Sequence, residues 1–231
     1  AAFHPDLCHV RIVGTLAEVQ GPLDAYHSSL AYYAWRHRMS ECQAADLFCD
    51  AVYRQLRFYD YWDSASQALL DEGQRAGMSL QGALRDWRLQ GCFMHAPAHP
   101  KIAVLADLAR RVLTTLDIPT LPLDPASLVW DDLAESPVWP LYPEIAAQLG
   151  CEGHTIFKGR SRGQAARGAA PAYDLQAFIH HAYEAYGRYS ASHELACTRE
   201  LTPRYQSIFG KTAQMTVVSF AKPASPSERQ H

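Results

Sequence analysis

Prolines constrain this chain most sharply at residues 93–101, where the sequence reads FMHAPAHPK. Proline lacks a backbone N–H and pushes the residue before it toward extended geometry, so Pro97 and Pro100 exclude an α-helix here. His95 and His99 lie four residues apart, but they cannot share a helical face as a pair of metal ligands. The spacing predicts a strand or loop that ends at His99, directly before a helix.

Helical periodicity is found on both sides of this break, because apolar residues recur at spacings of three and four. We predict helices over residues 25–39, 41–56, 59–77, 80–90, 101–116, 143–150 and 173–190. Short strands are predicted over residues 9–14, 155–158 and 215–220, and a long loop over 119–143. The predicted fold class is therefore α/β, predominantly α-helical with a few short strands, in a single domain over residues 1–220 with a disordered tail over 221–231.

Several helix ends carry capping signals. Ser40 with Gln43 three residues later is typical of a capping box, Ser79 is a candidate N-cap, and Pro100 suits a first helical turn. The helix over 101–116 has the clearest amphipathic pattern in the chain. Its predicted buried face consists of Ile102, Leu105, Leu108, Ala109, Val112, Leu113 and Leu116.

Composition limits the classes of protein to which the chain can belong. Hydrophobic residues make up 48% of the 231 residues and charged residues 19%, which is typical of a globular protein. A net charge of -3 argues against a nucleic-acid-binding protein, and no apolar run reaches the roughly 20 residues that a membrane span requires. The six cysteines form no CxxC pair, which indicates reduced thiols in a cytoplasmic protein and no metal site.

The start of the helix after Pro100 is a candidate anion site. Unpaired backbone N–H groups in a first helical turn, together with Lys101, favour a bound anion. His99 could act on a group bound there. The alternative is that His99 only packs beside the end of the helix.

Two further histidine clusters lie near the start of the chain. His27 and Ser28 fall in a predicted first helical turn, where an acyl oxygen could bind, or they serve only as a hydrogen-bonded cap. His4 and Asp6 lie close in sequence to Cys8, which could be an activated thiol or a small buried residue.

Basic residues gather in a glycine-rich segment near residue 160. Lys158 and Arg160 could contact phosphate groups there, or they belong to a solvated loop. Adjacent His180 and His181 diverge by about 100° around a helix, and we assign them no role.

Five stretches together resemble one family. They are FHPDLCHV, GPLDAYHSSLAYYAW, FMHAPAHPKIAVLADLARRVL, WPLYPEIAAQLGCEG and FK. The sequence resembles the polysaccharide biosynthesis protein WcbI family, whose members share an HPD segment, a YHS helix start, a T-x-NHP segment and a YP-x-IA-x-x-LG block. The matching order extends from residue 3 to residue 158.

The resemblance implies a coenzyme A-binding protein of capsular or exopolysaccharide biosynthesis, acting as a sugar O-acetyltransferase with acetyl-CoA. The implied catalytic residues are His99, His27 and Ser28. The implied cofactor-binding residues are His4, Lys101, Lys158 and Arg160. The partners are acetyl-CoA and a sugar or polysaccharide acceptor, and the oligomeric state is left open, a homo-oligomer included.

The chain departs from the family pattern at two places. Ala98 stands where the family has asparagine before the histidine and proline. The family's Gly-Asn-Cys-Gln segment, with its expected catalytic cysteine, has no counterpart, since Cys42 and Gln43 lie in the middle of a predicted helix. We therefore expect either that an N-terminal strand-turn-helix segment is missing from the chain as given or that it is supplied elsewhere. A non-catalytic binding or assembly subunit is the alternative function, and a thiol hydrolase that uses Cys8 is a third hypothesis.

Overall fold

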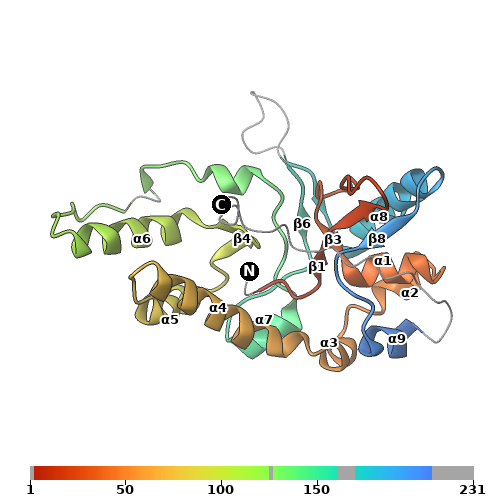
Figure 1. Ribbon diagram of the computed structural model, residues 1–231, viewed down its shortest axis with the longest axis horizontal. Helices are drawn as coiled ribbons and strands as arrows, with labels where there is room; N and C mark the ends of the chain where they lie inside the picture. Colours follow the sequence, from red (N-terminus) through yellow and green to blue (C-terminus); the bar gives the residue numbers. More distant parts are fainter. Residues whose placement is uncertain (1–2, 125–126, 161–169, 210–231) are drawn as a thin grey trace, which may run out of the picture.

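The structure, a computed structural model, describes residues 3–124, 127–160 and 170–209 (Figure 1). The described helices are α1 (Ser29–Arg36), α2 (Glu41–Ala45), α3 (Asp50–Leu56), α4 (Tyr61–Arg75), α5 (Gln81–Leu89), α6 (Ile102–Thr115), α7 (Pro143–Leu149), α8 (Leu175–Ser190), α9 (Pro203–Phe209) and the 3-10 helices η1 (Phe58–Asp60) and η3 (Asp132–Glu135). The predicted fold class is confirmed, because helices predominate and the strands are short.

The strands of the described residues form antiparallel pairs rather than one broad sheet. The strands are β1 (Leu7–Cys8), β2 (Val10–Ile12), β3 (His27–Ser28), β4 (Met94–Ala96), β5 (His99–Pro100), β6 (Phe157–Lys158), β7 (Ala172–Tyr173) and β8 (Leu195–Cys197). The pairs are β1 with β3, β2 with β8, β4 with β5 and β6 with β7. No pattern in the sequence predicts β3, β7, β8 or α9.

Helix α1 begins four residues after the start of the helix predicted over residues 25–39. Residues 27–28 pair with β1 as strand β3, so helix α1 begins only at Ser29. Ser28 is its N-cap, and the Ser28 side chain accepts a hydrogen bond from the Ala31 backbone N–H. The extended conformation of β3 thus overrides the helical periodicity of the sequence.

The predicted helix over 41–56 is two helices. The capping box of Ser40 and Gln43 is confirmed at the start of α2, but α2 ends at Ala45. Residues 46–49 form a turn before α3, closed by the hydrogen bond from Phe48 N–H to the Ala45 carbonyl. Two other predicted caps are wrong, because Leu80 precedes α5 without a side-chain cap and Pro100 lies in β5.

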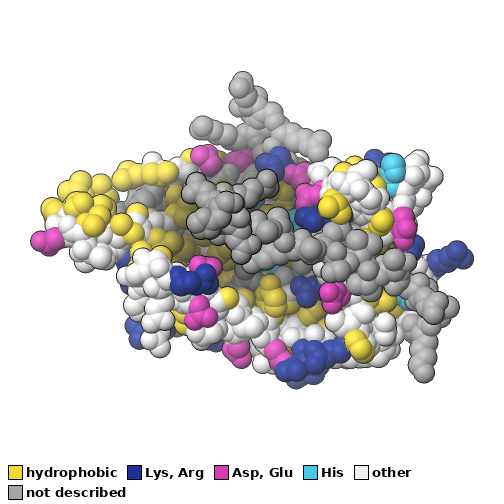
Figure 2. Space-filling model, viewed as in Figure 1, with side chains coloured by type: hydrophobic (Ala, Val, Ile, Leu, Met, Phe, Trp, Pro, Cys, Tyr) yellow, Lys and Arg dark blue, Asp and Glu magenta, His cyan; other side chains and the backbone are white. Residues whose placement is uncertain are grey.

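Helix α6 has the predicted extent but not the predicted packing. Val104 is its buried residue, while Leu105 and Val112 from the predicted buried face are 39% and 41% exposed. Asp107 lies on the packed side instead, where its carboxylate accepts a hydrogen bond from Trp87 Nε1 at 2.8 Å. Apolar side chains consequently gather on the surface near α6, at the left of Figure 2.

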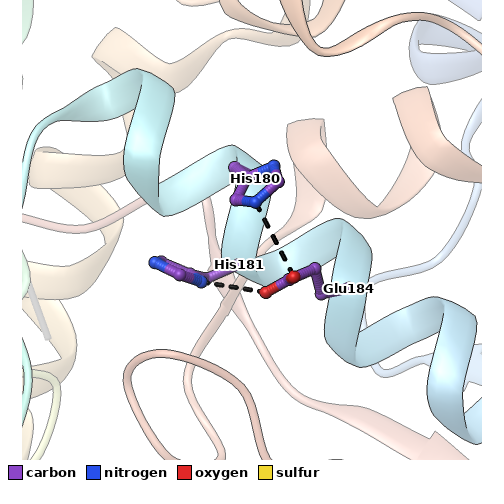
Figure 3. Close-up of side chains that lie close together, drawn as sticks. All are labelled: His180, His181 and Glu184. Carbon is purple, nitrogen blue, oxygen red and sulfur yellow. Dashed lines mark hydrogen bonds and ion pairs between the residues drawn. The ribbon is translucent and has the colours of Figure 1, made fainter.

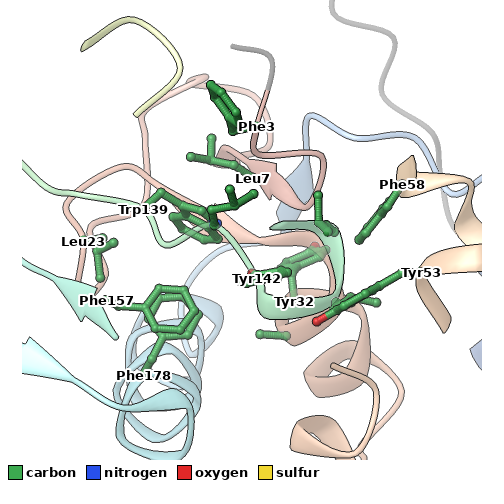
Figure 4. Close-up of a cluster of buried hydrophobic side chains, with 14 of the residues drawn as sticks. Phe3, Leu7, Leu23, Tyr32, Tyr53, Phe58, Trp139, Tyr142, Phe157 and Phe178 are labelled. Atoms are coloured by element: carbon green, nitrogen blue, oxygen red, sulfur yellow. The ribbon is translucent and has the colours of Figure 1, made fainter. Parts of the chain in front are cut away.

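Aromatic side chains fill the core between α8 and the segments that surround it (Figure 4). Phe157 from β6 and Phe178 from α8 stack with ring centroids 3.9 Å apart, and Trp139 meets both rings edge-on. Such aromatic pairs contribute roughly 0.5–1.5 kcal/mol beyond the burial of their area. Helix α8 also packs against α1 and α2, so a helix late in the described chain contacts two helices near its beginning.

Three predicted features lie outside the described residues, in whole or in part. They are the strand over 215–220, the tail over 221–231 and most of the glycine-rich segment, of which residues 161–169 are not described. Among the residues that are described, no helix has both the length and the apolar character needed to cross a membrane.

Candidate functional site

The β4–β5 hairpin builds the site from the segment that Pro97 and Pro100 keep out of a helix. Ala96 pairs with His99, and Met94 pairs with Pro100, with an irregularity between the two pairs. Lys101 follows as the N-cap of α6, and its backbone N–H donates to the Phe93 carbonyl at 3.0 Å. The predicted extended segment before a helix is therefore confirmed.

His95 forms a hydrogen-bonded pair with an aspartate from the proline-rich loop. His95 Nε2 lies 2.9 Å from Asp131 Oδ2, and the same oxygen accepts a hydrogen bond from Ile102 N–H at 3.0 Å. Burial alone would raise the pKa of Asp131, but the hydrogen bonds from His95 and Ile102 hold this pKa below its usual value. A carboxylate of the chain thus occupies the start of α6, where we had predicted an external anion.

A pocket of about 480 Å³ opens beside this pair. His95, Lys101 and His154 line it, together with the apolar residues Val138, Trp139 and Leu141. Its position is fixed through the backbone, because Trp139 N–H donates to the His95 carbonyl at 2.8 Å. The pocket therefore combines an oriented imidazole, an ammonium group and an apolar wall.

Two cysteines line the same pocket, but neither thiol is activated. Burial raises the pKa of Cys92, whose thiol donates to the Met94 carbonyl at 3.2 Å. Burial also raises the pKa of Cys151. Since the thiolate is the nucleophilic form, both residues act here as protonated, partly buried thiols.

His99 lies on the hairpin but does not line this pocket. Its ring is 6.3 Å from the ring of Tyr26, and its Nδ1 is buried without a hydrogen-bond partner among the described residues. Burial, followed by the positive charges of His95 and Arg160, lowers the pKa of His99. His99 is therefore neutral near pH 7, with one ring nitrogen free.

His27 and Ser28 lie inside the protein rather than in the pocket. His27 is fully buried, with Nδ1 3.1 Å from the Tyr186 hydroxyl and Nε2 2.9 Å from the Val19 carbonyl. Burial lowers the pKa of His27 to about 4. Ser28 is also buried and caps α1. Both side chains are used by the fold, and we do not include them in the catalytic site proposed below.

The N-terminal cluster is organised around Asp6, which is fully buried. Asp6 Oδ1 accepts hydrogen bonds from the Ser29 hydroxyl at 2.7 Å and from Leu30 N–H at 3.0 Å, and Oδ2 accepts one from the Tyr142 hydroxyl at 2.8 Å. A carboxylate at the start of α1 is favoured by the helix dipole. Asp6 therefore joins β1, α1 and α7, and its acceptor positions are taken up by the fold.

The remaining members of this cluster are buried. Burial lowers the pKa of His4 to about 3, with partial compensation from the Pro140 carbonyl. Neither ring nitrogen of His4 forms a hydrogen bond of ordinary geometry with the described residues. Burial raises the pKa of Cys8 well above its usual value, and Cys197 adds to this effect. A thiol hydrolase based on Cys8 thus lacks an accessible thiolate.

The predicted phosphate-binding residues Lys158 and Arg160 already bind acceptors of the chain. The Lys158 ammonium donates to the Ala134 carbonyl, and Arg160 Nε donates to Asp24 Oδ2 at 2.6 Å. Lys101 alone of the predicted cofactor-binding residues lines the pocket. The sequence patterns predict no role for His95, and no local motif distinguishes Asp131.

Comparison with known proteins gives one family. The model of the family described as polysaccharide biosynthesis enzyme WcbI matches residues 1–121, which is just over half of the 231 residues. No curated protein matches the chain, and no solved structure does. The matched part includes β4, β5 and all of α6, whereas Asp131 and the YPEIAAQLG stretch lie beyond it.

Proposed function

Because this chain belongs to the WcbI family of polysaccharide biosynthesis enzymes, we propose that it is a cytoplasmic O-acetyltransferase that transfers an acetyl group from acetyl-CoA to a sugar hydroxyl. The family supplies the role in polysaccharide biosynthesis. The observation that carries the proposed reaction is the His95–Asp131 pair at the wall of the pocket.

His95 is the general base in this proposal. When Nε2–H donates to Asp131, Nδ1 carries a lone pair and can take the proton from a sugar hydroxyl. The Asp131 carboxylate holds the ring and stabilises its positive charge after proton transfer. Acetyl-CoA, when bound, supplies an acetyl thioester as the acyl donor.

Lys101 and the apolar wall fit the reacting end of such a donor. A volume of about 480 Å³ lies within the range of roughly 300–1,000 Å³ found for small-molecule sites. The Lys101 ammonium can stabilise negative charge that develops on the acyl oxygen. Lys158 and Arg160 fit the phosphates less well, because a carbonyl and a carboxylate already satisfy them.

The test measures binding first and turnover second. Calorimetry with coenzyme A should show binding to the full chain, and acetyl transfer should then be assayed with acetyl-CoA and a panel of capsule sugars. His95→Gln should lower kcat roughly 10²–10⁴-fold, the usual contribution of a positioned general base. His193→Gln is the matched control, since His193 is exposed beyond α8.

Two results would refute the proposal. The first is the absence of coenzyme A binding to folded protein. The second is full turnover in His95→Gln. If His99→Gln were inactive in the same assay, the general base would be His99.

A non-catalytic binding subunit is the second candidate, and the unactivated thiols of Cys92 and Cys151 favour it. It predicts binding of coenzyme A or sugar without acetyl transfer to any acceptor.

A further inference from the structure

Three exposed side chains on α8 form a cluster that does not line the pocket: His180, His181 and Glu184 (Figure 3). One ligand atom from each lies within 4.8 Å of the other two. We propose that these residues bind a divalent transition metal ion such as Zn²⁺, and that Glu41 of α2 positions His180 for this role.

The helix brings the two histidines to one carboxylate. Adjacent side chains leave a helix about 100° apart, yet the rings of His180 and His181 lie with their centroids 5.3 Å apart. Glu184 follows them by four and by three residues, and both spacings make neighbours on a helix surface. Figure 3 shows both rings turned toward Glu184, which lies one turn further along α8.

The distances suit a metal ion. His181 Nδ1 lies 3.0 Å from Glu184 Oε2, and His180 Nε2 lies 3.7 Å from Glu184 Oε1. Two ligands of a tetrahedral zinc ion, with bonds of about 2.0–2.1 Å, lie about 3.3 Å apart. Since all three side chains are about half exposed, small rotations suffice to reach that separation.

Glu41 supplies the outer partner that metal-binding histidines usually have. Its Oε1 lies 3.0 Å from His180 Nδ1, so Nδ1–H can donate to Glu41. Nε2, which faces Glu184, is then the nitrogen that a metal ion would take once it displaces the proton there. The contact between Glu41 and His180 also links α2 to α8, two helices that already pack together.

The donor set indicates the class of metal. Two imidazole nitrogens and one carboxylate favour Zn²⁺, Co²⁺ or Ni²⁺ over Mg²⁺ and Ca²⁺, which prefer oxygen ligands. The carboxylates of Glu184 and Glu41 attract a dication, while Arg188 beside Glu184 opposes it. Three protein ligands leave at least one position open for water.

The experiment titrates Zn²⁺ into the metal-free full chain by calorimetry. One site per chain is expected, with a rise in the melting temperature on saturation. His180→Ala, His181→Ala and Glu184→Ala should each abolish binding at this site, and Glu41→Ala should weaken it about 10–100-fold, as outer-partner variants do. Co²⁺ spectra should show nitrogen and oxygen ligands without thiolate.

Two control variants make the result specific. His193→Ala removes another exposed histidine near the end of α8, and Cys42→Ser removes the exposed thiol next to Glu41. Both should bind Zn²⁺ like the unaltered chain. Absence of Zn²⁺ binding would overturn the proposal, as would binding that survives the loss of both histidines or that is lost in Cys42→Ser.

Discussion

Acid should destabilise this protein through His27, whose buried ring is neutral in the folded state. Burial places the pKa of His27 at about 4, compared with 6.5 for an ordinary histidine. Between these two values the unfolded chain binds a proton that the folded chain does not, so the free energy of unfolding falls as the pH falls. The stabilisation that comes from the neutral His27 ring is fully present above pH 6.5 and is lost progressively as the pH falls to about 4.

The magnitude follows from the gap between the two pKa values, which is about 2.5. Each pKa unit corresponds to 1.36 kcal/mol, so His27 should remove about 3 kcal/mol of stability across this range. That is a large part of the 5–15 kcal/mol that typically separates folded from unfolded states. His4, with a pKa of about 3, adds an effect of the same sign that also begins near pH 6.5 and extends down to about pH 3.

Urea unfolding between pH 4 and pH 7, followed by tryptophan fluorescence, measures this effect. His27→Gln keeps an N–H donor for the Val19 carbonyl but cannot titrate, and it leaves the Tyr186 hydroxyl without its acceptor. We expect roughly 1–3 kcal/mol lower stability at pH 7 and a flatter dependence on pH. Since His4 is present in both proteins, its effect cancels in the comparison. Equal slopes for His27→Gln and the unaltered chain would refute this reasoning.

Three further variants test how the fold holds the first helix and the pocket wall. Asp6→Asn removes a charged acceptor of three hydrogen bonds, so the free energy of unfolding in urea should fall by about 2 kcal/mol. Ser28→Ala removes the cap on Ala31 N–H, and its expected cost of about 1 kcal/mol can be read from the same titration. Gly153→Ala would place a Cβ atom 2.7 Å from the Leu141 carbonyl oxygen, so the melting temperature should fall by an amount equivalent to about 1–3 kcal/mol. Unchanged stability in any of the three would contradict the contact that it tests.

The sequence predicts those elements whose signals are local. Helices such as α7 and α8 form where apolar periodicity predicts them, and Gly150 has the left-handed conformation that ends α7. The start of α1 could not be predicted, because the pairing of β3 with β1 depends on a segment twenty residues away. Long-range pairing of this kind overrides a local helical preference.

The candidate site was predictable only in part, for the same reason. Pro97 and Pro100 determine that the histidines lie on an extended segment, and the structure confirms it. Which histidine meets the pocket depends on Asp131, thirty-six residues beyond His95 in a loop without periodicity. The histidine pattern around His27 suggested chemistry, yet burial and two hydrogen bonds assign that ring to the core.

Asp131 gives the most direct test of the proposed reaction, because one oxygen both caps α6 and holds His95. Asp131→Asn preserves the shape of the side chain, and its amide oxygen can still accept from His95 and Ile102. The amide is neutral, however, so it no longer stabilises the positive charge that His95 acquires when it takes a proton. We expect kcat to fall roughly 10²–10⁴-fold, while the melting temperature changes by the equivalent of only about 1 kcal/mol. If kcat falls no further than the loss of stability explains, or does not fall at all, Asp131 only supports the helix and takes no part in the reaction.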